Sequence, residues 1–217
     1  MLTLVRLLIV IVLVFALYWL VIRPWHARWG ATDDEVNRSL PGDGIAPAPN
    51  AQVTRAITIE APAVAIWPWL VQMGQEKAGL YSYEQLENLI GCDIHNSDHI
   101  VPAWQTIEVG DRVRMGPKGY PLFIVTEIVP DRALVMQAAD PKTEAPATAS
   151  WAFVLDEQPD GSTRLITRSR NQYEPTVPNF VLWRVVTEPL QFLMEQKMLR
   201  SIKTLVEQNG GQQPQAT

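Results

Sequence analysis

A single cysteine, Cys92, stands among the 217 residues, so the chain cannot form an internal disulfide. The sequence also lacks a basic tract, and its net charge of −5 leaves no electrostatic footprint for nucleic acid. It contains no Walker or dinucleotide-binding loop, no G-x-S-x-G elbow, and neither H-E-x-x-H nor C-x-x-C. We therefore expect no nucleic-acid partner, no cofactor and no metal.

Charge is missing from the stretch between Leu7 and Ile22. Counted from Leu2, a helix to Ile22 would be about 31 Å long, which matches a bilayer core of about 30 Å. Four aromatic residues gather toward one end of this run, as at a membrane interface: Tyr18, Trp19, Trp25 and Trp29. Residues 1–22 are therefore predicted to be a single-pass membrane anchor, with the domain on the extracytoplasmic side. A cleaved signal peptide and a buried helix are the alternatives.

Residues 23–50 are predicted to connect the anchor to the domain. Thr32 and Glu35 have the spacing of a capping box, which predicts a short helix at this point. The following stretch, rich in proline and glycine, ends any regular element: LPGDGIAPAPN.

Residues 51–208 are predicted to form one domain, followed by a disordered tail at 209–217. Short alternating runs predict strands near 52–59, 111–115, 121–129, 133–138, 149–157 and 163–173. Helical patterns follow the first strand, at 62–74 and 82–91, and a long one starts at 177. Pro68 and Pro189 are expected to kink or break their helices, and Ser82 with Gln85 predicts a second capping box. Arg55 interrupts the apolar face of the first strand.

The order strand, two short helices, several hairpin strands and one long helix defines an α+β fold. Only the last helix is long enough to lie across the sheet. We therefore expect a curved antiparallel sheet wrapped around this helix, with a cavity between them and the short helices closing one end.

Several phrases of the sequence resemble a group of membrane-anchored bacterial proteins in the START-like, polyketide-cyclase-like superfamily (SRPBCC), which has the helix-grip fold. The phrases include WGATDDEV, RAITIEAPAVAIWPWLVQMGQ, YSYEQLENLIGCDIHNSDHIVPAWQ and MEQKMLRSIK. The resemblance covers residues 51–208 and implies an internal cavity for an apolar small molecule. It implies no single chemistry, because fold alone does not fix function.

Residues 79–105 concentrate polar and aromatic side chains. A histidine that is held by a carboxylate can act as a general acid or base. His95, Asp98 and His99 are therefore the catalytic candidates. The same histidines are four residues apart, but the surrounding glycine, asparagine and proline predict a loop rather than a metal-binding helix. Asp93, Asn96 and similar residues also have a structural use, because they form turns and caps.

Amphipathic aromatic residues suit the mouth of a cavity, and methionines suit an adaptable apolar wall. An arginine on an inward face would suit a ligand carboxylate or a buried acid. The residues expected to bind ligand are Tyr81, Tyr83, His95, Trp104, Trp151, Arg168, Met194 and Met198. The predicted function is membrane-tethered binding of a small hydrophobic ligand or lipid. A cyclase- or dehydratase-like enzyme and a structural domain without a ligand are the alternatives.

Overall fold

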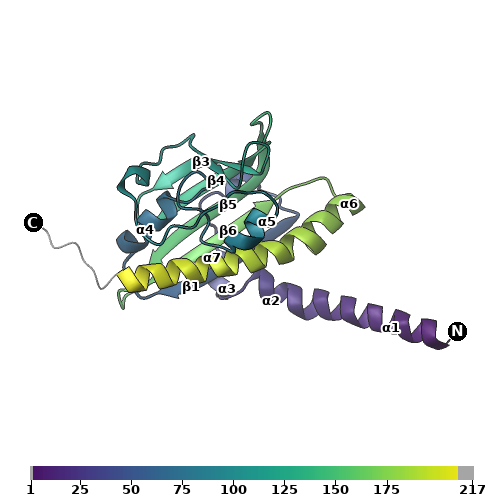
Figure 1. The fold of residues 1–217 in the computed structure, drawn as a ribbon. Coiled ribbons are helices and arrows are strands. Elements are labelled where there is room, and N and C mark those ends of the chain that lie inside the picture. The colour runs from purple at the N-terminus through teal and green to yellow at the C-terminus, as the bar shows by residue number, and fades with distance from the viewer. Residues whose placement is uncertain (1, 210–217) are drawn as a thin grey trace, which may run out of the picture.

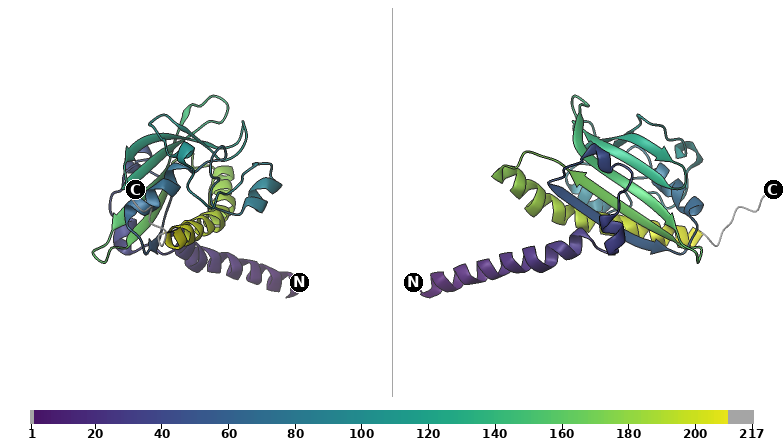
Figure 2. Two further views of the ribbon diagram at one scale, coloured as in Figure 1. Left: turned by 60° about the vertical axis from the view of Figure 1, so that its left-hand side comes forward. Right: turned by 180° about the vertical axis from the view of Figure 1, so that it is seen from behind.

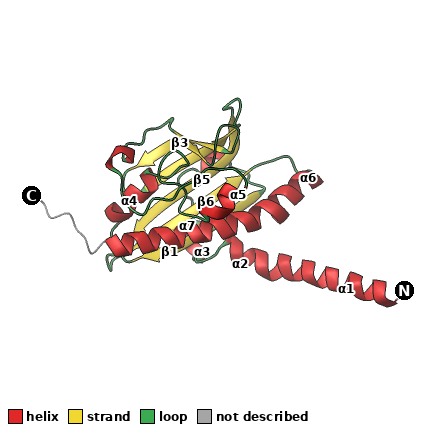
Figure 3. Cartoon of the chain, in the orientation of Figure 1, coloured by secondary structure: helices red, strands yellow, loops and turns green. Residues whose placement is uncertain are grey.

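A computed structural model describes residues 2–209, and these form the predicted α+β fold (Figure 1). Six antiparallel strands make one curved sheet in the order β1-β6-β5-β4-β3-β2. They are β1 (Ala51–Ile59), β2 (Arg112–Arg114), β3 (Leu122–Val129), β4 (Ala133–Ala139), β5 (Pro146–Glu157) and β6 (Thr163–Asn171). The short helices α4 (Ala63–Val71) and α5 (Glu84–Leu89) lie on the same side of the sheet as the long C-terminal helix (Figure 3).

The C-terminal helix consists of α6 (Val177–Phe180), a π-helical segment (Val181–Thr187) and α7 (Glu188–Asn209). The π-helical segment ends just before Pro189, which has no N–H to donate to the preceding turn. The backbone N–H of Glu188 donates to the carbonyl of Trp183, five residues back. Pro189 therefore coincides with a local change of helix type, and the helix continues on both sides of it.

The N-terminal helix is built in the same way, from α1 (Leu2–Leu17), a π-helical segment (Tyr18–Ile22) and α2 (Arg23–Ala27). Pro24 lies just after the π-helical segment. The helix therefore runs five residues beyond the predicted end at Ile22. Its stretch Val5–Ala27 is long and apolar enough to cross a membrane. Figure 2 shows α1 projecting away from the domain.

The residues after α2 pack against the sheet face opposite α7. They include α3 (Asp33–Asn37), which the predicted capping box of Thr32 and Glu35 begins. At the sheet edge, the N–H of Ala56 in β1 donates to the carbonyl of Trp29 at 3.1 Å. Residues 28–46 thus cover the outer face of the sheet and protect an edge strand. Figure 2 shows this segment in front of the sheet in the view from behind.

Two local predictions about helices were wrong. Ser82 does not cap α5, because the residue before the helix is Tyr83 and no side chain caps it. The Ser82 hydroxyl instead donates to the carbonyl of Met194 in α7 at 2.9 Å, so a tertiary contact replaces the local one. Pro68 does not divide its helix, since α4 runs unbroken from Ala63 to Val71.

Candidate functional site

Asn96 shapes the loop between α4 and β2. Its side-chain oxygen accepts hydrogen bonds from the N–H groups of Leu80 (3.1 Å) and Tyr81 (2.7 Å), and its amide donates to the carbonyl of Ser82 (3.1 Å). These three hydrogen bonds hold Tyr81 at φ 55°, a conformation that few non-glycine residues adopt. Gly79 leaves room for the Asn96 side chain, because a Cβ at position 79 would come within 2.5 Å of the Asn96 oxygen.

Gln72, at the end of α4, ties the two halves of this loop together. Its amide donates to the Tyr81 hydroxyl (2.9 Å) and to the carbonyl of His99 (3.1 Å), while its oxygen accepts from the N–H of Val101 (3.1 Å). The Tyr81 hydroxyl donates in turn to the carbonyl of Trp69 (3.1 Å). Burial raises the pKa of Tyr81. The hydroxyl is therefore a fixed donor rather than an acid.

The loop that Asn96 and Gln72 hold together lies beside α7, and the two enclose a surface groove of about 350 Å³. That volume falls within the usual range of small-molecule sites, roughly 300–1,000 Å³. Half of the lining comes from the loop and half from successive turns of α7. The residues are Tyr81, Ser82, Asn96, Ser97, Asp98, Lys197, Arg200, Ser201, Thr204 and Leu205.

The charges of the groove favour an anion. Within the described part of the chain Lys197 makes no ion pair, and the Arg200 guanidinium lies over the ring of Trp29, 5.3 Å from its centre. Asp98 is the one acidic residue of the lining, and its carboxylate already contacts the Nδ1 atom of His99 at 2.9 Å. The Ser201 hydroxyl adds a polar group on the same wall, whereas the Thr204 hydroxyl donates to the carbonyl of Arg200 at 2.9 Å.

A second hollow, of about 360 Å³, lies beside β2. Its charged groups are largely paired with one another or with a neighbouring loop. Arg114 lies 3.7 Å from Glu76, and Arg112 forms an ion pair with Glu144. Lys77 donates to the carbonyl of Thr106 at 3.3 Å, so the three basic side chains of this hollow already have partners and it offers an anion less than the groove along α7 does.

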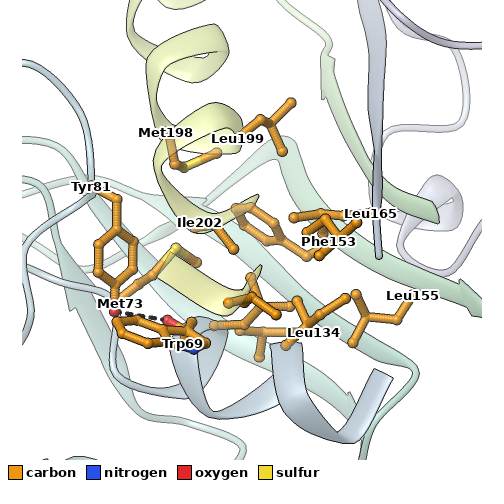
Figure 4. Packing of buried hydrophobic residues seen from close by; sticks show 14 of the residues in the cluster. Trp69, Met73, Tyr81, Leu134, Phe153, Leu155, Leu165, Met198, Leu199 and Ile202 are labelled. Atoms are coloured by element: carbon orange, nitrogen blue, oxygen red, sulfur yellow. Dashed lines mark hydrogen bonds between the residues drawn. The ribbon is translucent and has the colours of Figure 1, made fainter. Parts of the chain in front are cut away.

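The space between the sheet and α7 is filled by side chains (Figure 4). Met198, Leu199 and Ile202 of α7 are buried in one cluster with Phe153 and Leu165 of the sheet. Met73, Met136 and Met198 belong to this cluster, which makes its packing adaptable. Tyr81 joins the cluster beneath the groove, and Figure 4 shows it on the same flank as Met73 and Met198.

The predicted ligand-binding residues lie in different places. Tyr81 lines the groove, and Met198 is buried beneath it. Met194 is half-buried and lies next to Ser82, and Tyr83 is exposed at the start of α5. Trp104 packs at the rim of the core. The structure therefore brings only some of these residues together.

Arg168 lies on the opposite face of the sheet and is 2% exposed. Its guanidinium contacts Asp43 at 2.9 Å and donates to the carbonyls of Glu35 and Val36. The acid that it meets is only partly buried, with a side chain 18% exposed, and belongs to residues 28–46. We place Arg168 outside the groove for that reason.

The catalytic candidates are on the surface. His95 is 75% exposed, with its ring nitrogens 3.3 Å from Glu84 and 3.5 Å from Asp93. His99 and Asp98 form a pair, and both are exposed. No group of three His, Cys, Asp or Glu residues in the described part of the chain is placed to hold a metal ion.

The sequence did not reveal a buried polar cluster between the sheet and α7. Arg55 of β1 is fully buried and forms an ion pair with Glu195 of α7. The indole N–H of Trp151 donates to the same carboxylate at 3.1 Å, and the Nε atom of Arg55 donates to the carbonyl of His26 at 2.8 Å. The interruption of an apolar strand face by Arg55 was the one available signal. Trp151, expected to contact ligand, helps to hold this cluster.

Comparison with family models and with curated protein sequences finds no match for this chain. Solved structures of similar topology include CalC, a self-sacrificing resistance protein from Micromonospora echinospora (10% identity, TM-score 0.46, 76% of this chain and 99% of that one). Protein NE0264 from Nitrosomonas europaea matches at 13% identity and a TM-score of 0.44, over 78% of this chain and 99% of that one. DynU16, a protein encoded in the dynemicin biosynthetic locus, matches at 16% identity and a TM-score of 0.43, over 72% of this chain and 48% of that one.

Proposed function

We propose that this protein is a membrane-tethered binding protein for a small anionic amphiphile. The groove along α7 is the observation that carries the proposal. It combines Lys197, which makes no ion pair within residues 2–209, and the Ser201 hydroxyl with a partly apolar floor at Tyr81 and Leu205. A carboxylate or phosphate would lie against Lys197, and the apolar part of the molecule would lie on the floor.

The adaptable core beneath the groove supports an amphiphile in particular. Tyr81 separates the groove from the buried Met73 and Met198. Methionine side chains change conformation at little cost, so a hydrocarbon chain could enter the interior between Tyr81 and α7. The internal cavity expected from the sequence would then open only when a ligand occupies it.

The N-terminal helix supports the tether. Most of the described apolar side chains between Val5 and Ile22 are exposed, and water does not favour such a surface. In a bilayer the same surface would face acyl chains. We place the domain on the extracytoplasmic side of the membrane. A reporter that is active only in the cytoplasm, fused after Thr217, tests this orientation. Reporter activity would show that the domain lies in the cytoplasm instead.

A direct test titrates the full chain in lipid nanodiscs with dansyl-labelled undecanoic acid, with empty nanodiscs as the background. Lys197→Glu should weaken binding roughly tenfold, since losing an attraction and adding a repulsion costs about 1 kcal/mol or more. Lys142→Glu makes the same charge change on an exposed loop outside the groove and should leave affinity unchanged. Equal affinities for wild type and Lys197→Glu would refute the groove as the site.

A second candidate function is acid–base catalysis at the rim, because Asp98 lines the groove and contacts His99. Its hydrogen bond with His99 lowers the pKa of Asp98, so the pair can hold a histidine ring in one orientation. Native mass spectrometry of what co-purifies separates the two functions. Catalysis predicts compounds of different mass on wild type and His99→Ala, whereas binding alone predicts the same compound on both.

A further inference from the structure

The helical segment 177–193 carries a stripe of exposed apolar side chains. Its members are 41–77% exposed and recur one or two to a turn: Val177, Phe180, Val181, Leu182, Val185, Val186, Leu190 and Leu193. We call this surface the apolar stripe. Isolated exposed apolar residues are normal, but a continuous row of this length marks a surface that meets something other than water.

The two charged side chains of the same segment point inward. Arg184 and Glu188 are its only charged residues, and they contact each other at 2.7 Å. Glu188 is 3% exposed and also pairs with Arg23 of α2 at 2.8 Å. A helix on a water-facing surface has the opposite arrangement, with charges outward and apolar residues inward.

The apolar stripe is continuous with the N-terminal helix. Phe180 stacks on Trp19 with ring centres 5.3 Å apart, and the Tyr18 hydroxyl donates to the carbonyl of Arg184 at 3.1 Å. Figures 1 and 2 show α1 and α6 leaving the same end of the molecule. A bilayer that surrounds α1 up to Trp19 would therefore also reach Phe180.

We propose that segment 177–193 lies in the surface of the membrane that α1 spans and forms a second membrane contact beside the anchor. The inference rests on the tether in the proposed function. The apolar stripe would contact the boundary between lipid headgroups and acyl chains, where aromatic and aliphatic side chains such as these are stable. Because Arg184 and Glu188, the two charged side chains of the segment, lie on the protein side, the segment brings no charged side chain into the lipid.

This placement gives the groove a source of ligand. Lys197 and Ser201 follow Leu193 at intervals of four residues, so they continue the face of the helix that bears the apolar stripe. One turn, about 6 Å along the axis, separates Leu193 from Lys197. An amphiphile that leaves the bilayer along the stripe would thus reach the cationic end of the groove first.

The test uses spin labels on the full chain in liposomes. In a Cys92→Ala background, single cysteines replace Leu182, Val186 or Leu190. Val10→Cys reports the anchor, and Gln208→Cys reports an exposed position at the far end of α7. Collision rates with oxygen, which concentrates in lipid, are compared with those of a water-soluble nickel chelate.

We expect the three stripe labels and Val10→Cys to collide several-fold more with oxygen than with nickel, and Gln208→Cys to show the reverse. Stripe labels that behave like Gln208→Cys, with Val10→Cys still in lipid, would overturn this inference and leave the tether standing. Stripe labels shielded from both reagents, with spin–spin broadening, would overturn it in favour of a second copy of the chain. Nickel access at Val10→Cys as well would overturn the tether itself, while the titration of the groove would stand independently.

Discussion

Arg55 of β1 and Glu195 of α7 form an ion pair in the interior, where neither side chain is more than 3% exposed. Breaking such a pair leaves one charge buried without a partner. We expect Arg55→Met and Glu195→Leu each to cost roughly 3–5 kcal/mol of unfolding free energy. The double variant Arg55→Met/Glu195→Leu should cost far less than the sum, with urea unfolding as the measurement.

An exposed ion pair serves as the control for this comparison of single and double variants. Arg112 pairs with Glu144 at the surface, with side chains 52% and 34% exposed. Arg112→Met should leave the unfolding free energy close to that of the wild type, because solvent screens an exposed pair. Strictly additive losses at Arg55 and Glu195 would show that the buried residues stabilise the fold separately rather than as a pair.

The segment that covers the outer sheet face is expected to be essential for folding. A chain that starts at Arg23 keeps residues 28–46, whereas one that starts at Asn50 loses every contact of Arg168 with them. The second chain would expose to water the apolar residues Ala56 and Ile166, against which Leu40 packs, and would leave the edge strand β1 uncovered. Circular dichroism melts should show cooperative unfolding for the first chain and aggregation for the second, and equal melting temperatures would contradict this role.

Stability should also depend on the protonation of Glu87 in α5. Burial, and secondarily the charge of Glu84, raises the pKa of Glu87 to about 7. The folded state thus binds the proton more tightly than the unfolded state, in which the pKa of a glutamate is near 4.5. The stabilisation is complete below the unfolded pKa and is lost as pH rises through about 7.

Glu87→Gln should remove this loss and stabilise the chain above pH 7, by at most about 3 kcal/mol at roughly 1.4 kcal/mol per pKa unit. Melting temperatures at pH 5 and pH 8 give the measurement. Glu127→Gln changes an exposed carboxylate and should leave the pH dependence of wild type intact. A Glu87→Gln variant with the same pH dependence as wild type would rule out this account.

Much of the fold could be predicted from local patterns. The alternation of β1, the turn at Asp160 and Gly161 between β5 and β6, and the apolar periodicity of α7 are all properties of neighbouring residues. They define strands, hairpins and the long helix without any knowledge of tertiary contacts.

The site could be predicted only in part, because its contacts join distant parts of the chain. Tyr81 was expected in the groove, but Lys197 and Ser201 lie over 100 residues further on and have no local signal. The partners Arg55 and Glu195 are 140 residues apart. The inward turn of Arg184 likewise depends on the anchor helix, which a periodicity argument about one helix cannot include.

The most direct test of ligand binding in the groove is photo-crosslinking of the full chain in nanodiscs with a diazirine-bearing palmitic acid, followed by peptide mass spectrometry. The account predicts adducts within residues 81–98 and 197–205. Unlabelled palmitate should suppress them, and Lys197→Glu should reduce them relative to Lys142→Glu. Adducts confined to the N-terminal helix 2–27, or adducts in the groove that unlabelled palmitate does not suppress, would contradict it.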